Sequence, residues 1–231
     1  MRSVGLTTLA GLLADRTRAA FCVALLDGRA WTSGELAAHA GVAASTTSEH
    51  LTRLIAGGLL VERRQGRHRY VQLASPQVAQ LLEDLVAHGE PPPARTLKAA
   101  SACAAMARAR TCYDHLAGRL GVAITDAMTT RGLLSQSDGF ALTDAGLAWL
   151  TGPLGASEAH LRATKRPLSR PCLDWTERRT HLAGTAGAHV CSHFQAQGWI
   201  RRIGTTRAIR LTPTGVTALR DLLDLDATTL A

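Results

Sequence analysis

The chain has 231 residues, enough for one large domain or two ordinary ones, and its 46% of hydrophobic residues exclude wholesale disorder. A formal net charge of +8 fits a polyanionic partner such as nucleic acid. No run of residues is apolar enough to span a membrane, and the five widely spread cysteines argue against a secreted disulfide framework, so we expect a cytoplasmic protein without a membrane partner.

Residues 1–90 are predicted to form a DNA-binding and dimerisation domain with a winged helix-turn-helix fold. Apolar stripes indicate one helix around residues 6–13 and a second around 17–26. A short third helix begins at Thr32 or Ser33, which can cap it, and ends at Gly41. The remaining predicted elements are a helix over 44–56, a β-hairpin with its tip at Gln65-Gly66, and a closing helix that begins at Ser75.

The helix over 44–56 and the hairpin after it carry the candidate DNA-binding residues. On the helix these are the positions outside the apolar face, where polar side chains can reach phosphates and base edges: Ser45, Thr46, Ser48, Glu49, His50, Thr52 and Arg53. On the hairpin they are the basic residues of a predicted wing: Arg63, Arg64, Arg67, His68 and Arg69. Two alternatives remain open, a His50 that supports the turn and a wing that is only a solvated charged hairpin.

The order of motifs from Phe21 to Val86 is ELAAHAGVAASTTSEHLTRLIAGGLL, a basic hairpin, YVQL and a closing helix. This segment, about a third of the chain, resembles the ArsR/SmtB family of bacterial repressors. The resemblance implies a homodimer that pairs through its first and closing helices, here the stripes Leu6-Leu9-Leu13 and Val78-Leu82-Leu85. It also implies binding to a short inverted repeat in a promoter, usually as a repressor that an inducer releases.

Two metal sites familiar in that family have no counterpart in this sequence. Metal sensors often carry an ELCVCDL-like cysteine pair on the helix before the turn, where this chain reads GELAAHAG. The other site uses Asp and His on the closing helix, and here Asp84 and His88 lack the second His and the Glu partners. The resemblance therefore does not supply the inducer.

A Pro-rich linker, 91–95, is predicted to separate the first domain from a C-terminal effector module, 96–231. The module contains an internal repeat, about 108–155 and 168–226, in which Leu116, Gly121 and Gly132 correspond to Leu182, Gly187 and Gly198. Each copy continues into a short strand and a helix, for which Thr143 and Thr212 are the predicted N-caps. The predicted fold class is mainly α with small β-hairpin wings (α+β), an N-terminal winged helix-turn-helix followed by two winged-helix-like repeats.

An Arg-x-Cys-x-Asp element in both repeats supplies the candidate effector residues Cys112, Asp114, His115, Cys172 and Asp174. We expect Cys112 and His115 to share one face of a helix. Thiolates with an imidazole suit Zn²⁺ or another thiophilic ion, and the sequence requires no cofactor. The alternatives are cysteines that only pack, a thiol-redox sensor, or a small-molecule pocket. The aspartates can instead cap helices or pair with Arg110 and Arg170 across the repeat.

These patterns predict a sequence-specific DNA-binding transcriptional regulator and no enzyme, because the Cys and His residues lack an orienting third residue and an oxyanion-type loop. The favoured form is a dimeric repressor of double-stranded DNA at an inverted-repeat operator, released by a small-molecule or metal effector that acts through the C-terminal module. The alternatives are a metal- or thiol-responsive sensor using Cys112, His115 and Cys172, and a non-specific chromosome-associated DNA-binding protein. A second basic hairpin, Arg201 to Arg210, is equally suited to contact DNA or protein.

Overall fold

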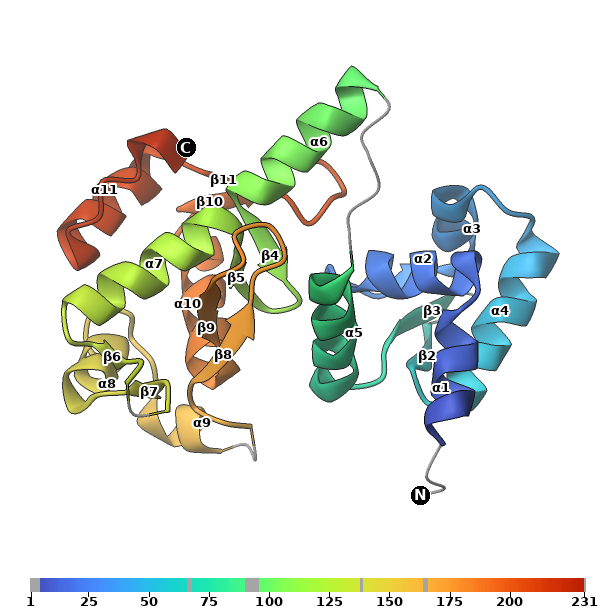
Figure 1. The fold of residues 1–231 in the computed structure, drawn as a ribbon, viewed down its shortest axis with the longest axis horizontal. Coiled ribbons are helices and arrows are strands. Elements are labelled where there is room, and N and C mark those ends of the chain that lie inside the picture. The colour runs from blue at the N-terminus through green and yellow to red at the C-terminus, as the bar shows by residue number, and fades with distance from the viewer. Residues whose placement is uncertain (1–4, 66–67, 90–95, 138, 164–165, 231) are drawn as a thin grey trace. The chain divides into compact units, whose positions relative to one another are not determined.

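The fold is mostly helical, with short antiparallel sheets between the helices (Figure 1). The computed structural model describes residues 5–65, 68–89, 96–137, 139–163 and 166–230. The chain divides into two compact units, Met1–Leu85 and Val86–Ala231. The predicted linker, 91–95, lies outside the described residues.

The first unit has the element order of a winged helix-turn-helix, as the sequence predicts. Its elements are α1 (Leu6–Leu13), α2 (Arg16–Leu25), β1 (Trp31–Thr32), α3 (Ser33–Ala40), α4 (Ala44–Ala56), β2 (Leu60–Gln65), β3 (His68–Leu73) and most of α5 (Pro76–His88). The sheet order is β1-β3-β2, so β2 and β3 form the wing and β1 covers its inner edge.

The ends of α3 explain how the turn before α4 is fixed. The Thr32 hydroxyl accepts a hydrogen bond from the Glu35 N–H at 3.2 Å, and the Glu35 carboxylate accepts one from the Thr32 N–H at 2.7 Å. This capping box starts the helix by satisfying two donors that a helix end otherwise leaves unpaired. Gly41 ends it in the left-handed region, with φ of 66°. Leu51 and Leu54 are fully buried, which fixes the inner face of α4 and leaves its outer face toward solvent.

Buried Arg18 on α2 holds the end of α1. Its guanidinium donates to the carbonyl oxygens of Leu12 at 2.6 Å and Gly11 at 2.9 Å, two groups that a helix C-terminus otherwise leaves unpaired. No residue of α1 is buried, although the helix is rich in leucine, and Leu6 is 82% exposed. Helix α1 therefore presents an uncovered apolar surface in the single chain.

The second unit repeats one order of elements: hairpin, helix, two short strands, helix. The first copy is β4 (Arg110–Cys112), β5 (His115–Ala117), α7 (Gly118–Thr130), β6 (Leu134–Ser135), β7 (Ala141–Leu142) and α8 (Asp144–Thr151). The second copy is β8 (Arg170–Leu173), β9 (Thr180–Ala183), α10 (Gly184–Ala196), β10 (Ile200–Arg202), β11 (Ile209–Leu211) and α11 (Pro213–Leu223). The elements outside this order are α6 (Leu97–Arg108), α9 (Glu158–Arg162) and the 3₁₀ turn η1 (Thr228–Leu230). Thr143 and Thr212 cap α8 and α11 through their side chains, as predicted.

The prediction that Cys112 and His115 share a helical face is wrong, because both lie on strands of a tight hairpin. Tyr113 and Asp114 form its two-residue turn, and Tyr113 has φ of 56°, which a helix does not allow. Gly118, with φ of 73°, then starts the helix. Apolar side chains four residues apart suggested a helix, but the hairpin is buried on both faces and so hides the alternation of a strand.

The two repeats pack crosswise, with α7 against β9 and α10 against β5 (Figure 1). One glycine in each of these helices lets the helix lie close to the hairpin of its own repeat. A Cβ at Gly121 would lie 2.4 Å from the Leu116 carbonyl oxygen, and one at Gly187 would lie 2.4 Å from that of Leu182. Both distances are far below van der Waals contact, so each position requires glycine. The repeats also share one hydrophobic core, in which α7 and α10 both take part.

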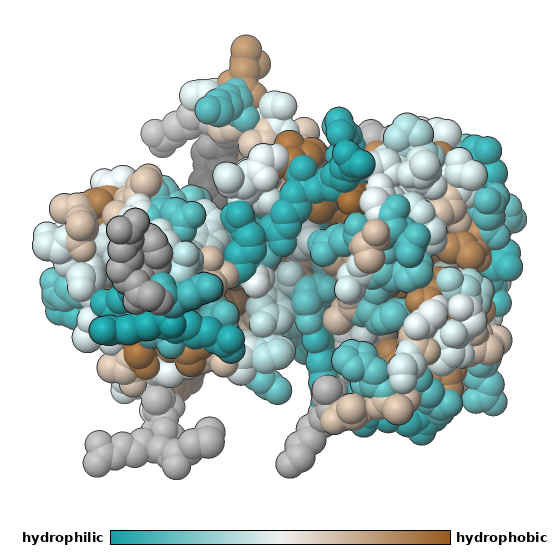
Figure 2. All heavy atoms as spheres, turned by 180° about the vertical axis from the view of Figure 1, so that it is seen from behind, coloured by the Kyte–Doolittle hydropathy of each residue, from teal (hydrophilic) through white to brown (hydrophobic). Residues whose placement is uncertain are grey.

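The molecular face in Figure 2 is largely hydrophilic, with hydrophobic atoms in small separate patches. Among the described residues no helix combines the length and hydropathy needed to cross a bilayer.

Candidate nucleic-acid interface and a buried cysteine–histidine cluster

The outer face of α4 is a row of short polar and charged side chains. Ser45, Ser48 and Thr52 are exposed, and Thr46 is half-buried. Glu49 and Arg53 are also exposed and form an i,i+4 ion pair at 2.6 Å. The N-cap residue, Ala43, makes no side-chain hydrogen bond, so the first N–H groups of α4 have no capping side chain. Small side chains and uncapped N–H groups at a helix start favour close approach of a phosphate.

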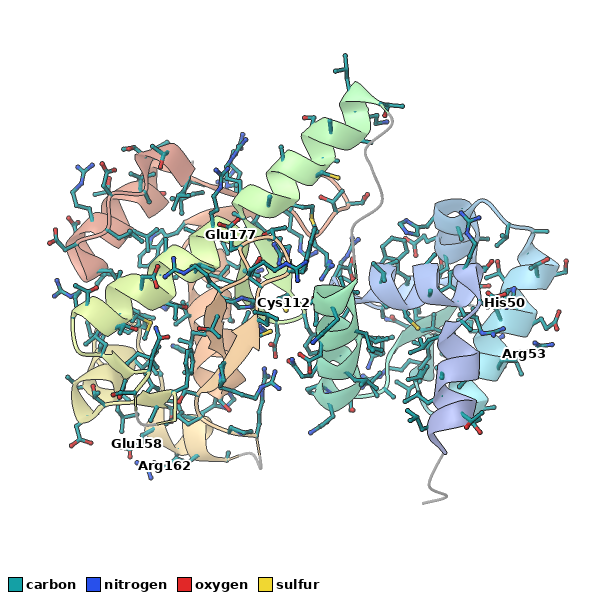
Figure 3. All side chains as sticks on the ribbon, in the orientation of Figure 1. His50, Arg53, Cys112, Glu158, Arg162 and Glu177 are labelled. Atoms are coloured by element: carbon teal, nitrogen blue, oxygen red, sulfur yellow. The ribbon has the colours of Figure 1, made fainter. Side chains whose placement is uncertain are left out.

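His50 differs from its neighbours, because its ring points back toward α2. Its Nδ1 lies 3.4 Å from Arg18 and 3.8 Å from Asp15, and its ring meets Phe21 edge-on. Figure 3 labels His50 and Arg53 on the same helix. In this position His50 packs α4 against α2, an arrangement that fits the alternative in which His50 supports the turn.

The wing arranges two of its arginines around one carboxylate. Glu62 accepts a hydrogen bond from Arg64 Nε at 3.0 Å and from Arg69 Nε at 2.7 Å. Hydrogen bonds and charge from Arg64 and Arg69 hold the pKa of Glu62 below its usual value. Arg63 is exposed on the other face of the ribbon, opposite Tyr70. Arg67 and the side chain of His68 lie outside the described residues.

The second basic hairpin, β10–β11, is only partly available to a partner. Arg201 and Arg210 are exposed and lie directly opposite each other. Arg207 is buried, and its carbonyl oxygen accepts a hydrogen bond from the Thr111 N–H at 3.0 Å. This end of the hairpin therefore packs against the rest of the second unit, and Arg207 is not exposed to a partner.

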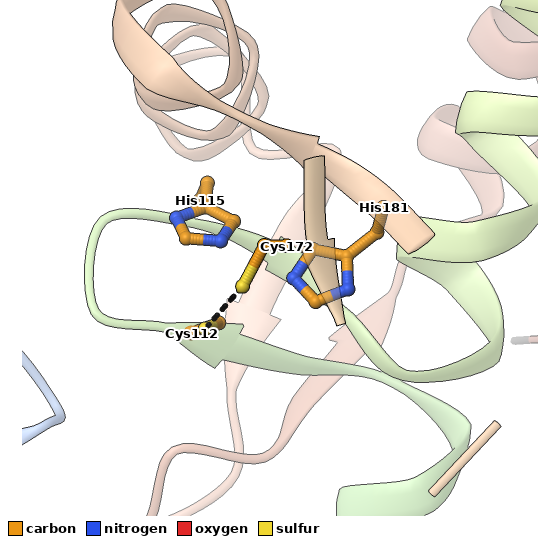
Figure 4. A group of neighbouring side chains, drawn as sticks. All are labelled: Cys112, His115, Cys172 and His181. Atoms are coloured by element: carbon orange, nitrogen blue, oxygen red, sulfur yellow. Dashed lines mark hydrogen bonds between the residues drawn. The ribbon is translucent and has the colours of Figure 1, made fainter. Parts of the chain in front are cut away.

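In the second unit the first hairpin of each repeat contributes one cysteine and one histidine. Cys112 pairs with His115 across β4–β5, and Cys172 pairs with His181 across β8–β9. Directly opposed residues of an antiparallel pair point to the same face, so each hairpin presents a thiol beside an imidazole. The strands β5 and β9 are in contact, which brings the two pairs together (Figure 4).

The four side chains form a compact group in the core. One donor atom from each lies within 4.8 Å of all the others, and all four residues are buried. The two Sγ atoms are 3.8 Å apart, much farther than the length of a disulfide bond. The rings of His115 and His181 lie 5.1 Å apart, centroid to centroid. We call these four residues the Cys₂His₂ cluster.

Each histidine of the Cys₂His₂ cluster has a carboxylate behind it. His115 Nδ1 is 3.2 Å from Asp114 Oδ1, and His181 Nδ1 is 3.4 Å from Asp174 Oδ2. The aspartates are held in turn: Asp114 by the guanidinium of Arg166, and Asp174 by Arg110 and the Gly118 N–H. The predicted pairing of Arg110 with an aspartate across the repeat is present, whereas Asp114 pairs with Arg166 and not with Arg170.

The electrostatics of the Cys₂His₂ cluster favour a thiolate. A hydrogen bond with Cys112 lowers the pKa of Cys172 far below the usual thiol value; desolvation opposes this, and His115 and His181 lower it further. Burial alone lowers the pKa of His115, but Asp114 and Cys172 outweigh it and raise that pKa. By contrast, burial raises the pKa of Cys191, outside the cluster, to about 12.

The sequence predicts three members of the Cys₂His₂ cluster as candidate effector residues, Cys112, His115 and Cys172, but not His181. The available signal was the repeat itself, because His115-Leu116-Ala117-Gly118 recurs as His181-Leu182-Ala183-Gly184. An imidazole at the same place in both copies, each paired with a cysteine of an Arg-x-Cys-x-Asp element, would have completed the set.

Comparison with known proteins places both units among transcriptional regulators. A helix-turn-helix domain model matches residues 13–63. The chain is 35% identical over 218 residues to YdfF, an uncharacterized HTH-type transcriptional regulator of Bacillus subtilis, and the match covers 94% of this chain and 96% of YdfF. It is 43% identical over 86 residues to the HTH-type transcriptional regulator CmtR of Mycobacterium tuberculosis, covering 37% of this chain and 72% of CmtR.

Among solved structures, the NMR structure of the cadmium metal-sensor CMTR from M. tuberculosis is 38% identical to this chain. It matches 39% of this chain and 100% of its own, with a TM-score of 0.32. Transcriptional regulators are a non-enzymatic class, in agreement with the sequence prediction.

Proposed function

The chain belongs to the ArsR-like family of HTH-type DNA-binding transcriptional regulators, and on that premise we propose that it is a dimeric repressor of an inverted-repeat operator, controlled through its second unit. The observation that carries the proposal is the exposed polar face of α4 followed directly by a basic wing. A helix of this kind enters the major groove, and a wing of this kind lies along the backbone or the minor groove.

The proposed contacts divide between the two elements. On α4, Ser45, Thr46, Ser48 and Thr52 contact phosphates and base edges, Glu49 accepts from a cytosine amino group, and Arg53 contacts guanine or phosphate. On the wing, Arg63, Arg64, Arg67, His68 and Arg69 bind the backbone. Glu62 holds Arg64 and Arg69 before DNA arrives, which lowers the entropy lost on binding. His50 acts indirectly, through the packing of α4 on α2.

Exposed leucines support the dimer. Leu6 on α1 is 82% exposed, and Leu81 and Leu85 on α5 are 36% and 50% exposed. Leu82, part of the stripe that the family resemblance implied, is buried in the single chain. We therefore assign the pairing surface to Leu6, Leu81 and Leu85. A twofold axis through it places two α4 helices on successive half-sites.

The second unit is the proposed receiver of the effector. YdfF matches 94% of this chain, so it shares both units, and a regulator that only read DNA would need only the first. The repressor acts where the DNA is, in the cytoplasm. The proposed effector is a small molecule, a metal ion or a thiol reagent that acts on this unit.

The test is selection of genomic fragments by the full-length chain, followed by titration of one selected fragment and one random duplex. Specific repressors bind their site about 10³- to 10⁷-fold more tightly than random DNA, and we expect a ratio in that range with a steep salt dependence. Arg64→Ala should weaken binding to both duplexes and lower the salt slope by about 1. Equal affinity for both duplexes would instead favour a non-specific chromosome-associated protein.

A further inference from the structure

We propose that Cys112, His115, Cys172 and His181 bind one Zn²⁺ ion in a closed tetrahedral site that joins the two repeats of the second unit (Figure 4). The site is independent of the proposed DNA contacts, all of which lie in the first unit. It also lies on different elements from α3 and α5, on which the metal sites of the family resemblance would fall.

The spacing of the donor atoms fits the ion. Two thiolates bound tetrahedrally to Zn²⁺, each at about 2.3 Å from the metal, lie about 3.8 Å apart. The Sγ atoms of Cys112 and Cys172 are 3.8 Å apart, and all four donor atoms fall within 4.8 Å of one another. The two sulfur atoms therefore already stand at the separation that a tetrahedral zinc site requires, with both imidazoles beside them.

Buried nitrogen atoms provide a second, independent observation. His115 Nε2 and His181 Nε2 are buried and have no hydrogen-bond partner among the described residues, whereas His181 Nδ1 has the ion-pair contact with Asp174 at 3.4 Å. A buried polar atom without a partner costs about 1–3 kcal/mol, so such atoms in a native core require an explanation. Coordination of a cation supplies the missing partner for one nitrogen of each ring.

The carboxylates behind the rings complete the arrangement. In metal sites the second imidazole nitrogen usually faces a carboxylate, which fixes the ring and makes the ligating nitrogen more basic. Asp114 and Asp174 occupy this position at the Nδ1 atoms, which leaves Nε2 of each ring for the metal. Arg166 and Arg110 neutralise the two aspartates. A divalent cation with two thiolates and two neutral imidazoles then adds no net charge to the core.

The donor set also selects the ion and its role. Two soft sulfur and two imidazole donors favour Zn²⁺ and similar thiophilic ions, and they disfavour Mg²⁺ and Ca²⁺, which bind oxygen. Four protein ligands in a buried site leave no open position for a substrate, as in structural zinc sites. Each repeat supplies one Cys and one His, so neither repeat alone has enough ligands for the ion. The bound ion therefore links the hairpin β4–β5 to the hairpin β8–β9.

The experiment measures metal in the full-length chain, expressed without a metal-binding tag and purified under reducing conditions without chelator. We expect one zinc per chain by elemental analysis and the same mass increment by native mass spectrometry. Replacement by Co²⁺ should give the visible bands of a tetrahedral site and the charge-transfer absorption of two thiolates. Removal of zinc with a strong chelator should lower the midpoint of thermal unfolding, since metal binding is coupled to folding. No DNA is present, so the outcome is separate from that of the proposed function.

Variants assign the ligands. Cys112→Ser and Cys172→Ser should each halve the thiolate-to-cobalt absorption, and His181→Ala should reduce bound zinc to background. Asp114→Asn should weaken zinc binding by about 10- to 100-fold while all four ligands remain. Cys191→Ala is the matched control, because it removes another buried thiol of the same unit; it should keep one zinc per chain.

The wild-type chain alone can overturn the proposal, whether or not the variants fold. A folded chain that contains no metal and takes up neither Zn²⁺ nor Co²⁺ would do so. A wild-type chain isolated with a Cys112–Cys172 disulfide that persists in excess zinc and reductant would also overturn it and would leave the thiol-redox reading. Metal content unchanged by both Cys172→Ser and His181→Ala would show that the ion binds elsewhere.

Discussion

Arg110 and Asp174 lie 64 positions apart in the sequence and form an ion pair at 2.9 Å in which both side chains are almost completely buried, at 1% and 0% exposure. The Arg110 guanidinium also stacks on the ring of Trp175, 4.6 Å from its centre. Asp174 further accepts hydrogen bonds from Thr176 and from the N–H of Gly118. This pair therefore ties the first hairpin, the start of α7 and the second hairpin to one carboxylate.

Arg110→Ala should destabilise the second unit by about 3–5 kcal/mol, because it leaves the Asp174 carboxylate buried without its counter-ion. Urea unfolding followed by circular dichroism would measure the loss. The control is Arg179→Ala, which breaks an ion pair with Asp126 that is 60% and 40% exposed. That change should cost about 0–1 kcal/mol. If both variants lose a similar unfolding free energy, the buried ion pair stabilises the second unit no more than an exposed one.

The first unit could be predicted from sequence almost element by element, because its signals are local. The capping residue Thr32, Gly41 after α3 and the apolar face of α4 each act within one or two turns of a helix. The second unit was predicted less well. Strands β4 and β5 have three residues each, and the crosswise packing of the repeats hides their alternation. His181 escapes a search by spacing because it faces Cys172 across a longer hairpin than the one that joins Cys112 to His115.

Gly187→Ala should destabilise the second unit by several times the cost of an ordinary surface change. Its Cβ would lie 2.4 Å from the Leu182 carbonyl oxygen and 3.2 Å from the Cβ of His115, so α10 must shift away from both hairpins. Thermal unfolding of the full chain would detect this. As a control, Gly11→Ala on α1 meets nothing within 4 Å and should stabilise the first unit by about 0.5–1 kcal/mol through helix propensity. If Gly187→Ala and Gly11→Ala change the thermal unfolding midpoint equally, α10 can move away from β9 without loss of stability.

Arg53→Ala should weaken binding to the selected operator by about 1–3 kcal/mol and relax its specificity, as expected for an arginine that contacts a base. Fluorescence anisotropy with operator and random duplexes would measure both effects. Arg162→Ala is a close control, because Arg162 forms the same kind of exposed i,i+4 ion pair with Glu158 and the change in charge is equal (Figure 3). Equal effects of the two changes would reduce the role of Arg53 to general charge.

The capping box of α3 should make the first unit dependent on pH. Hydrogen bonds from the Thr32 N–H and hydroxyl lower the pKa of Glu35 below its usual value. A carboxyl group whose pKa falls on folding stabilises the fold above its unfolded pKa and loses that contribution as the pH falls through the folded value. Unfolding free energies at pH 6 and pH 3 should therefore differ more in the wild type than in Glu35→Gln.

The same capping box can be tested at neutral pH by removing its other member, the Thr32 side chain. Thr32→Ala should cost about 1 kcal/mol at pH 7, because it removes the side chain that caps α3. Urea unfolding would measure this loss. If Thr32→Ala unfolds at the wild-type urea concentration, the cap contributes nothing.

Leu6→Glu combined with Leu85→Glu should convert the dimer to a monomer, because charges replace the exposed leucines of the proposed pairing surface. Sedimentation velocity would show the change in mass, and operator affinity should fall with it. Ile203→Glu, at another exposed apolar position in the second unit, should leave the dimer intact. A dimer that survives both leucine changes would place the contact on other elements.

The division of the Cys₂His₂ cluster between two hairpins affects how the chain is made. Cys112 and Cys172 are separated by 60 positions, and at a synthesis rate of about 5–20 residues per second the second hairpin leaves the ribosome roughly 3–12 s after the first. During this interval a newly made chain carries a thiol and an imidazole on a hairpin that has no counterpart to cover it. The first repeat therefore cannot bury Cys112 and His115 as the finished fold does until the second hairpin is made.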